Sequence, residues 1–182
     1  MTAPVRVRVS EEEYLATMTG EKPSLEFVNG EVFQKPMTKK DHQDVSKRIV
    51  ALMYELERRK LGYFAWETTT NLSEGADRRY RVPDIAFWAS GRVVAQPDNV
   101  YLPPTLAVEI RSEGQSMRSL RDKCREYRSR GIEVCWLIDP IQRSVEVFEE
   151  GREGVEIEAG AVLASEKIRG FRMPIADLWA EL

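Results

Sequence analysis

A carboxylate in the middle of an apolar strand is strongly constrained in what it can do. Glu109 lies in TLAVEIRS (105–112), where alternation places it on the face opposite three aliphatic side chains. Burying an ionised carboxylate costs free energy unless a cation, a metal ion or a hydrogen-bond network compensates it. An ion pair with Arg111, on the same face, is the purely structural alternative. Glu109 is therefore a candidate metal ligand.

A second carboxylate follows a proline in RVPDIAFW (81–88). Pro83 favours an extended residue before it and removes a ladder donor, which is typical of a strand edge or bulge. Taken alone, the Pro83–Asp84 pair usually marks only a turn. Two carboxylates on adjacent strands can, however, bind Mg²⁺ or Mn²⁺, and Mg²⁺ prefers oxygen ligands at ~2.0–2.1 Å and keeps several waters. Asp84 and Glu109 could thus hold a hydrolytic metal.

A helix expected over 116–129 adds basic side chains. Lys123 lies at the flank of its apolar face, and a lysine near a metal can orient the attacking water or stabilise charge on a phosphoryl oxygen. Periodicity alone favours a Lys123 that extends past the helix edge into solvent. The opposite side carries an arginine stripe that could follow phosphates, although a solvated face paired with nearby acids is commoner. The stripe consists of Arg118, Arg121, Arg125 and Arg128, and the apolar face of Met117, Leu120, Cys124 and Tyr127.

Other reactive residue types give weaker signals. His42, the only histidine, shares a helical face with Val45 and Ile49, and such a histidine is more often a hydrogen-bonded core residue than a base or ligand. Glu26 lies in a hairpin strand and is ambiguous without a fold. The two cysteines lack metal-ligand spacing, so we interpret them as small buried hydrophobes without redox chemistry.

Local signals predict the elements in the first half of the chain. Ser10 before three glutamates predicts the start of a short helix that ends near Gly20. Asn29-Gly30 between apolar segments predicts a β-hairpin at 25–35. Apolar residues at steps of four, three and four predict an amphipathic helix from Asp41 to about Lys60, ended by Gly62.

The second half alternates strands and helices. Strand-like runs cover 63–72 and 81–88, and a proline-containing loop follows them. Residues 105–139 have the length of a βαβ crossover, which predicts two parallel neighbouring strands. Further strands with a turn near Gly151 come next, and PIADLWAEL predicts a short final helix with Pro174 in its first turn.

The overall composition is that of one globular domain spanning residues 1–182, with 42% hydrophobic and 31% charged residues. No apolar run approaches the ~20 residues that cross a bilayer, and the start lacks a secretory signal, so we expect a cytoplasmic protein without membrane attachment. The formal charge of −3 excludes a uniformly basic surface but allows a local basic patch.

The order and spacing of short segments over nearly the whole chain resemble the Uma2 family of restriction-type endonucleases, also catalogued as a domain of unknown function. The segments are EEYLA, LEFVNGE, His42-Gln43, VPDIAFW, LAVEIRS, KCREY, RGIEVCWLIDP and FRMPIADLW. The family resembles the PD-(D/E)XK nucleases, which implies an α/β fold with a restriction-endonuclease-like mixed β-sheet flanked by helices and an N-terminal β-hairpin.

The resemblance also implies roles for residues. Asp84 and Glu109 match the metal-binding aspartate and acid, and Lys123 matches a catalytic lysine moved from the strand to the next helix. Glu26 and His42 would be supporting residues. The chain departs from the simple motif at Arg111, where a standard nuclease has lysine. Either Arg111 contacts phosphate while Lys123 assists catalysis, or the site binds metal and nucleic acid without efficient cleavage.

These implications predict Mg²⁺- or Mn²⁺-dependent hydrolysis of phosphodiester bonds in DNA. The backbone carbonyl of Ile110 is a further candidate ligand, and Arg118 joins Arg111 as a candidate phosphate contact. A nucleic-acid-binding or accessory protein without strong catalysis is the alternative, and a hydrolase of another phosphate ester is a third. Specificity would come from loops such as 91–104, from a partner, or from homodimerisation, since duplex cleavage needs two sites.

Overall fold

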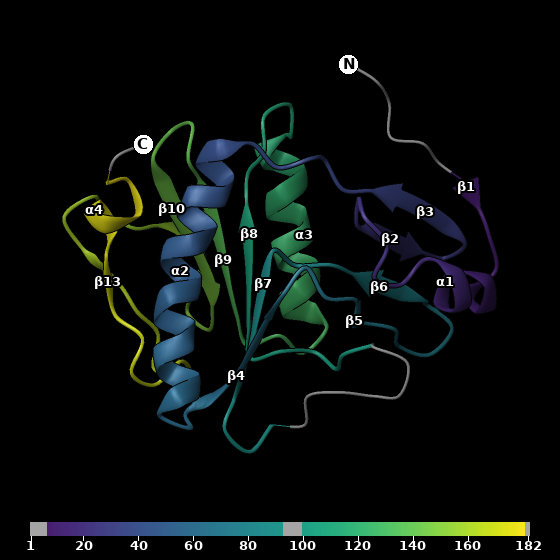
Figure 1. The fold of residues 1–182 in the computed structure, drawn as a ribbon, viewed down its shortest axis with the longest axis horizontal. Coiled ribbons are helices and arrows are strands. Elements are labelled where there is room, and N and C mark those ends of the chain that lie inside the picture. The colour runs from purple at the N-terminus through teal and green to yellow at the C-terminus, as the bar shows by residue number, and fades with distance from the viewer. Residues whose placement is uncertain (1–6, 93–99, 181–182) are drawn as a thin grey trace.

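The main sheet of the protein carries helices on both faces (Figure 1). The computed structural model describes residues 7–92 and 100–180, and within them this sheet has six strands in the order β11-β10-β9-β8-β7-β4. Strands β8 and β9 pair in parallel around α3, and the other neighbours are antiparallel. The predicted mixed sheet and βαβ crossover are confirmed. The elements are β4 (Gly62–Trp66), β7 (Ile85–Ala89), β8 (Leu106–Ile110), β9 (Val134–Asp139), β10 (Ser144–Glu149), β11 (Arg152–Glu156), α2 (Lys40–Arg58) and α3 (Met117–Ser129).

The central strand β8 is buried on both of its faces. Leu106, Val108 and Ile110 belong to a core that includes residues of α2, as their alternation predicts. Ala107 belongs to a second core with Cys124 of α3 and with β9. Both cysteines are free and buried, as predicted. Glu109 points from β8 toward α3 and is buried among protein atoms. Its polar contacts come from side chains of α3.

A second sheet packs beside the first and has the strand order β1-β3-β2-β6-β5 (Figure 1). The predicted hairpin is confirmed, because Asn29 and Gly30 both have positive φ, as a two-residue turn of this kind requires. The predicted first helix is confirmed too, with Ser10 Oγ capping it. Tyr14 of this helix packs on Phe27 and closes a small aromatic core. The elements are β1 (Val7–Arg8), α1 (Glu11–Thr17), β2 (Leu25–Val28), β3 (Glu31–Gln34), β5 (Thr70–Asn71) and β6 (Arg79–Arg81).

Each strand-like run over 63–72 and 81–88 is divided between the two sheets, which the sequence pattern did not predict. The first run gives β4 and then β5, and the second gives β6 and then β7. The break in the second run falls at 82–84, where Pro83 cannot donate a ladder hydrogen bond. Asp84 therefore lies at the junction of the two sheets rather than inside a strand.

The end of α2 differs from the prediction as well. The helix ends at Arg58, and Lys60 takes the left-handed conformation there. Gly62 is instead the first residue of β4, and a Cβ atom on it would lie 2.3 Å from the Phe87 ring and from the Trp88 carbonyl. Close strand packing, not helix termination, requires this glycine.

The C-terminal segment completes the core beside α2. It contains β12 (Val162–Leu163), β13 (Met173–Pro174) and the short α4 (Ile175–Leu178), which begins directly after Pro174 as predicted but covers only four residues. Phe171 stacks on Trp136 with ring centroids 4.8 Å apart. In the parts of the chain described, no helix is both long and apolar enough to cross a membrane.

Candidate active site

Asp84 is fixed at the sheet junction by contacts to both of its oxygens. Oδ2 accepts a 2.6 Å hydrogen bond from the backbone N–H of Ile110 and lies 3.2 Å from His42 Nε2. Oδ1 lies 2.7 Å from Lys35 Nζ. The aspartate is 4% exposed. The bond to Ile110 ties Asp84 to the strand that carries Glu109, so the two predicted carboxylates belong to one site.

Lys123 bridges two buried carboxylates. Its Nζ lies 2.9 Å from Glu109 Oε1 and 2.7 Å from Glu26 Oε1. The Tyr127 hydroxyl donates a 2.6 Å hydrogen bond to the same oxygen of Glu109. The Lys123 side chain is only 13% exposed, so the expectation that it extends into solvent is wrong. Compensation by Glu109 and Glu26 accounts for its burial at the helix flank.

Glu26 links the hairpin sheet to this lysine. Its Oε1 also accepts a hydrogen bond from the Val82 backbone N–H, and its Oε2 lies 3.0 Å from Arg81 Nη1. Arg81 in turn forms a two-pronged pair with Glu126 of α3, with both N···O distances 2.7 Å. The site is therefore assembled from both sheets and from α3, and the second sheet positions charged groups that the first sheet alone lacks.

Mutual attraction keeps these buried groups charged. Burial opposes ionisation of Glu26, but Lys123, Arg81 and Lys35 together lower its pKa to about 2. Burial likewise opposes ionisation of Asp84, yet Lys35 and His42 hold its pKa well below the usual range. Burial would lower the pKa of Lys35 and Lys123, but the surrounding carboxylates raise both. At neutral pH the cluster is a network of ion pairs.

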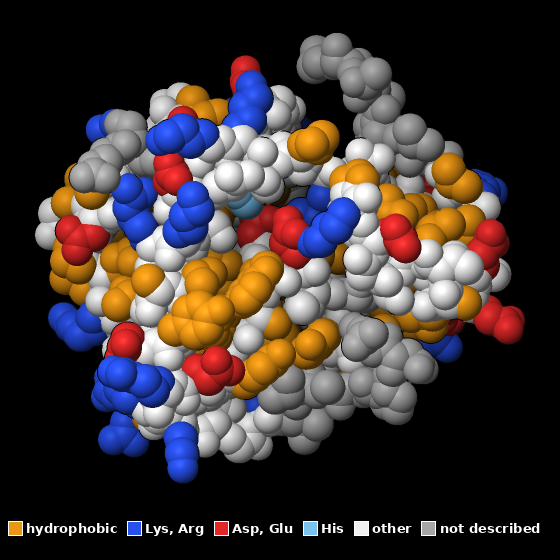
Figure 2. Space-filling view, viewed as in Figure 1, with side chains coloured by type: hydrophobic (Ala, Val, Ile, Leu, Met, Phe, Trp, Pro, Cys, Tyr) orange, Lys and Arg blue, Asp and Glu red, His pale blue; other side chains and the backbone are white. Residues whose placement is uncertain are grey.

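Asp84 and His42 line a surface hollow of about 210 Å³. Figure 2 shows this hollow between the two halves of the molecule, with acidic and basic side chains around it and a small part of the histidine visible inside it. Trp66, 51% exposed, stands at its rim at the end of β4. The lining residues are Thr38, His42, Gln43, Ser46, Lys47, Trp66, Glu67 and Asp84. A second hollow of about 440 Å³, lined by residues 71–74, 102–103 and 129–131, contains none of the predicted site residues.

Not every predicted site residue joins the cluster. Arg111 Nη1 lies 2.7 Å from Asp139 Oδ2, and its Nε donates to the Gln115 carbonyl. The alternative ion pair between Arg111 and Glu109 is therefore wrong, since Glu109 pairs with Lys123. Arg118 is exposed on α3. The rest of the arginine stripe pairs with acids, namely Arg121 with Glu146, Arg125 with Asp122 and Arg128 with Glu153. Of the loop 91–104, residues 93–99 lie outside the described residues.

Lys35, Arg81 and Tyr127 belong to the cluster but were not among the predicted site residues. Lys35 follows β3 in a segment without periodicity, so nothing local marks it. Tyr127 was assigned only to the buried face of α3, yet a buried hydroxyl needs a partner, and its position one turn after Lys123 would have aimed it at the same carboxylate.

The donor set fits a hard divalent cation that keeps part of its water shell. Among the described residues, no group of three His, Cys, Asp or Glu side chains is placed to hold a metal by itself. Mg²⁺ and Mn²⁺ sites often use one or two carboxylates plus substrate phosphate and waters, and Asp84 with Glu109 meets that need. The contacts of Glu109 with Tyr127 and with Lys123 both use Oε1, so neither of them occupies Oε2.

Comparisons with known proteins agree with the fold. The sequence profile of the Uma2 family, described as "Putative restriction endonuclease", matches residues 11–176. A crystal structure at 1.96 Å resolution of a putative nuclease belonging to DUF820, from Anabaena variabilis ATCC 29413, superposes with a TM-score of 0.81 at 22% identity. The match covers 94% of this chain and 97% of that chain, which shows that the two share a fold. A search of curated proteins finds no match.

Proposed function

Because the chain belongs to the Uma2 family of putative restriction endonucleases, we propose that it is an endonuclease that hydrolyses phosphodiester bonds of DNA with a divalent metal ion. One observation carries the proposal. Asp84, at the sheet junction, is tied through the Ile110 N–H to the strand that carries Glu109 and its partner Lys123, and Asp84 lines a hollow that is open to solvent. Charged groups with strongly perturbed pKa values next to a cleft are typical of a functional site.

Asp84 and Glu109 would hold Mg²⁺ or Mn²⁺, with the carbonyl of Ile110 as a further ligand. The metal, when bound, would polarise the phosphoryl group and lower the pKa of a bound water. His42 and the Ile110 N–H fix the orientation of Asp84, and the Tyr127 hydroxyl fixes that of Glu109.

Lys123 supplies the positive charge next to the reacting phosphate. Its ammonium group is held between Glu109 and Glu26, so it keeps its charge and its position while the substrate binds. From there it can donate to a phosphoryl oxygen or orient the attacking water. Glu26 is a positioning residue in this scheme, because it reaches the substrate only through Lys123.

The arginines would contribute to substrate binding rather than to bond cleavage. Arg118 is exposed on the first turn of α3 and can contact phosphate directly. Arg111 is tied to Asp139 and would have to share its guanidinium with a phosphate.

A non-cleaving nucleic-acid-binding protein on the same scaffold is the second candidate. Lys35 favours it, because this lysine already occupies Asp84 Oδ1. Binding that persists without metal, falls steeply with salt and is accompanied by no cleavage would support this candidate.

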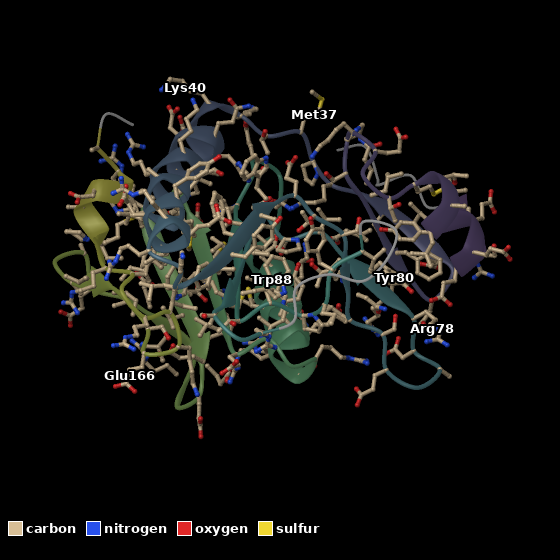
Figure 3. The ribbon with its side chains drawn as sticks, turned by 60° about the horizontal axis from the view of Figure 1, so that its bottom comes forward. Met37, Lys40, Arg78, Tyr80, Trp88 and Glu166 are labelled. Carbon is tan, nitrogen blue, oxygen red and sulfur yellow. The ribbon has the colours of Figure 1, made fainter. Side chains whose placement is uncertain are left out.

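The test is incubation of supercoiled plasmid and of single-stranded DNA with the protein in Mn²⁺, Mg²⁺ or EDTA. We expect metal-dependent cleavage that is lost in Asp84→Asn and Lys123→Met. Glu166→Gln and Lys167→Met provide matched controls, since both side chains are exposed on the C-terminal segment; Figure 3 labels Glu166 at the edge of the molecule. A wild-type protein that binds Mn²⁺ through Asp84 but cleaves neither substrate would refute the nuclease.

A further inference from the structure

A chain segment crosses from β3 to α2 (Figure 1), and its residue Lys35 contacts Asp84. The backbone N–H of Lys35 donates to the Ser24 carbonyl across the hairpin. Its Nζ donates to the Val82 carbonyl and to Asp84 Oδ1, both at 2.7 Å, and the side chain is 12% exposed. Two residues farther on, Met37 projects outward and is 82% exposed (Figure 3). Within this segment Lys35 points into the protein, whereas Met37 points into solvent.

Lys35 and a metal ion would compete for the same carboxylate. Oδ2 of Asp84 already accepts from the Ile110 N–H and faces His42, whereas Oδ1 is bonded to Lys35. A divalent ion on Asp84 would therefore stand close to an ammonium group in a poorly hydrated place, where repulsion between positive charges is strong. The ion has to displace Lys35 or lose affinity.

The balance of charge in the cluster points the same way. Three carboxylates, Asp84, Glu26 and Glu109, face three cations, Lys35, Lys123 and Arg81, and Arg81 is shared with Glu126. Adding a divalent ion gives these six groups a net charge of +2, or of +1 when Glu126 is counted with them. A phosphodiester group supplies negative charge, and an ammonium on a flexible stem can move from a carboxylate to a phosphate.

We propose that Lys35 pairs with Asp84 and so prevents the metal from binding there until a nucleic-acid phosphate pairs with the lysine instead. Metal binding is then weak in the free protein and strengthens when DNA binds, and by linkage the metal strengthens DNA binding by the same factor. This inference rests on the proposed metal site at Asp84. It adds a residue that makes metal binding depend on the presence of the substrate.

The test measures Mn²⁺ affinity by electron paramagnetic resonance of free Mn²⁺, without DNA, in four proteins. They are the wild type, Lys35→Met, Lys35→Arg and Lys39→Met, where Lys39 is an exposed lysine of the same segment paired with Glu113. We expect Lys35→Met to bind Mn²⁺ tighter by about tenfold or more, a change that removal of one close positive charge supports. Lys35→Arg, which keeps the charge, and Lys39→Met should stay near wild type.

A second measurement needs no variant at Lys35. The Mn²⁺ affinity of the wild type is measured once in the presence of a phosphorothioate oligonucleotide, which is charged, and once in the presence of a methylphosphonate oligonucleotide, which is neutral. Only the charged one should strengthen binding, again by about tenfold.

The outcomes separate the two proposals. Equal Mn²⁺ affinity in wild type and Lys35→Met, abolished in both by Asp84→Asn, would overturn the role of Lys35 and leave the metal site standing. Mn²⁺ binding that is absent from every protein, or that survives Asp84→Asn, would overturn the metal site and this inference with it. Equal effects of the two oligonucleotides would overturn the inference even if Lys35→Met failed to fold.

Discussion

Replacing Lys123 with methionine removes the cation that two buried carboxylates share. Glu26 and Glu109 are 5% and 2% exposed, so water cannot solvate either carboxylate in place of the lysine. The pKa of Glu26, lowered from its ordinary 4.5 to about 2, corresponds to about 3 kcal/mol of stabilisation at neutral pH, of which Lys123 provides the largest favourable share. Breaking a buried pair by removing one partner costs a similar amount, about 3–5 kcal/mol. We expect Lys123→Met to lose about 3 kcal/mol of stability at pH 7.

The pH dependence distinguishes this cause from lost packing. Since the folded pKa of Glu26 is depressed, its stabilisation is present above the unfolded value of 4.5 and is lost as the pH falls toward about 2. Urea denaturation at pH 7 and pH 3.5 should therefore show the gap between wild type and Lys123→Met shrinking by about 1 kcal/mol. Lys167→Met, an exposed lysine, is the control. A gap of the same size at both pH values would refute the electrostatic reasoning.

Three further changes test neighbouring contacts. Tyr127→Phe removes the hydroxyl that donates to Glu109, and we expect about 1–2 kcal/mol lower stability in urea denaturation; an unchanged value would contradict the role of this bond. Arg111→Met leaves Asp139 buried without its cation, so stability should fall by about 2–3 kcal/mol while Mn²⁺ affinity stays constant. Trp66→Ala, at the rim of the hollow, should weaken binding of single-stranded DNA in an anisotropy titration, with stability within about 0.5 kcal/mol of wild type. Unaltered DNA affinity would exclude this tryptophan from substrate contact.

The parts of the fold that depend on local signals could be predicted from the sequence. Asn29-Gly30 dictates its own hairpin, since both residues must take positive φ. Ser10 begins α1 because its side chain caps the first turn. The carboxylates were recognisable for a related reason, because Glu109 in a strand buried on both faces needs a cation, whatever the surrounding topology.

The remaining features depend on contacts between distant segments. The division of 63–72 and 81–88 between two sheets follows from where Pro83 interrupts the ladder, and from which partners are then within reach. The partner of Arg111 is Asp139, on the parallel neighbour β9, a contact that alternation within one strand cannot reveal. Lys35 reaches Asp84 across 49 positions, so the residue that we propose to control metal binding carries no local sign of its role.

Plasmid cleavage by wild type and Glu109→Gln, in Mn²⁺ and in EDTA, tests the central claim most directly. Glutamine keeps an oxygen that can accept from Tyr127 and Lys123, and Lys123 retains Glu26, so the variant should fold. We predict Mn²⁺-dependent conversion of supercoiled plasmid by the wild type and none by Glu109→Gln. Cleavage that Glu109→Gln retains, or that EDTA does not stop, would contradict a metal-dependent nuclease site at Asp84 and Glu109.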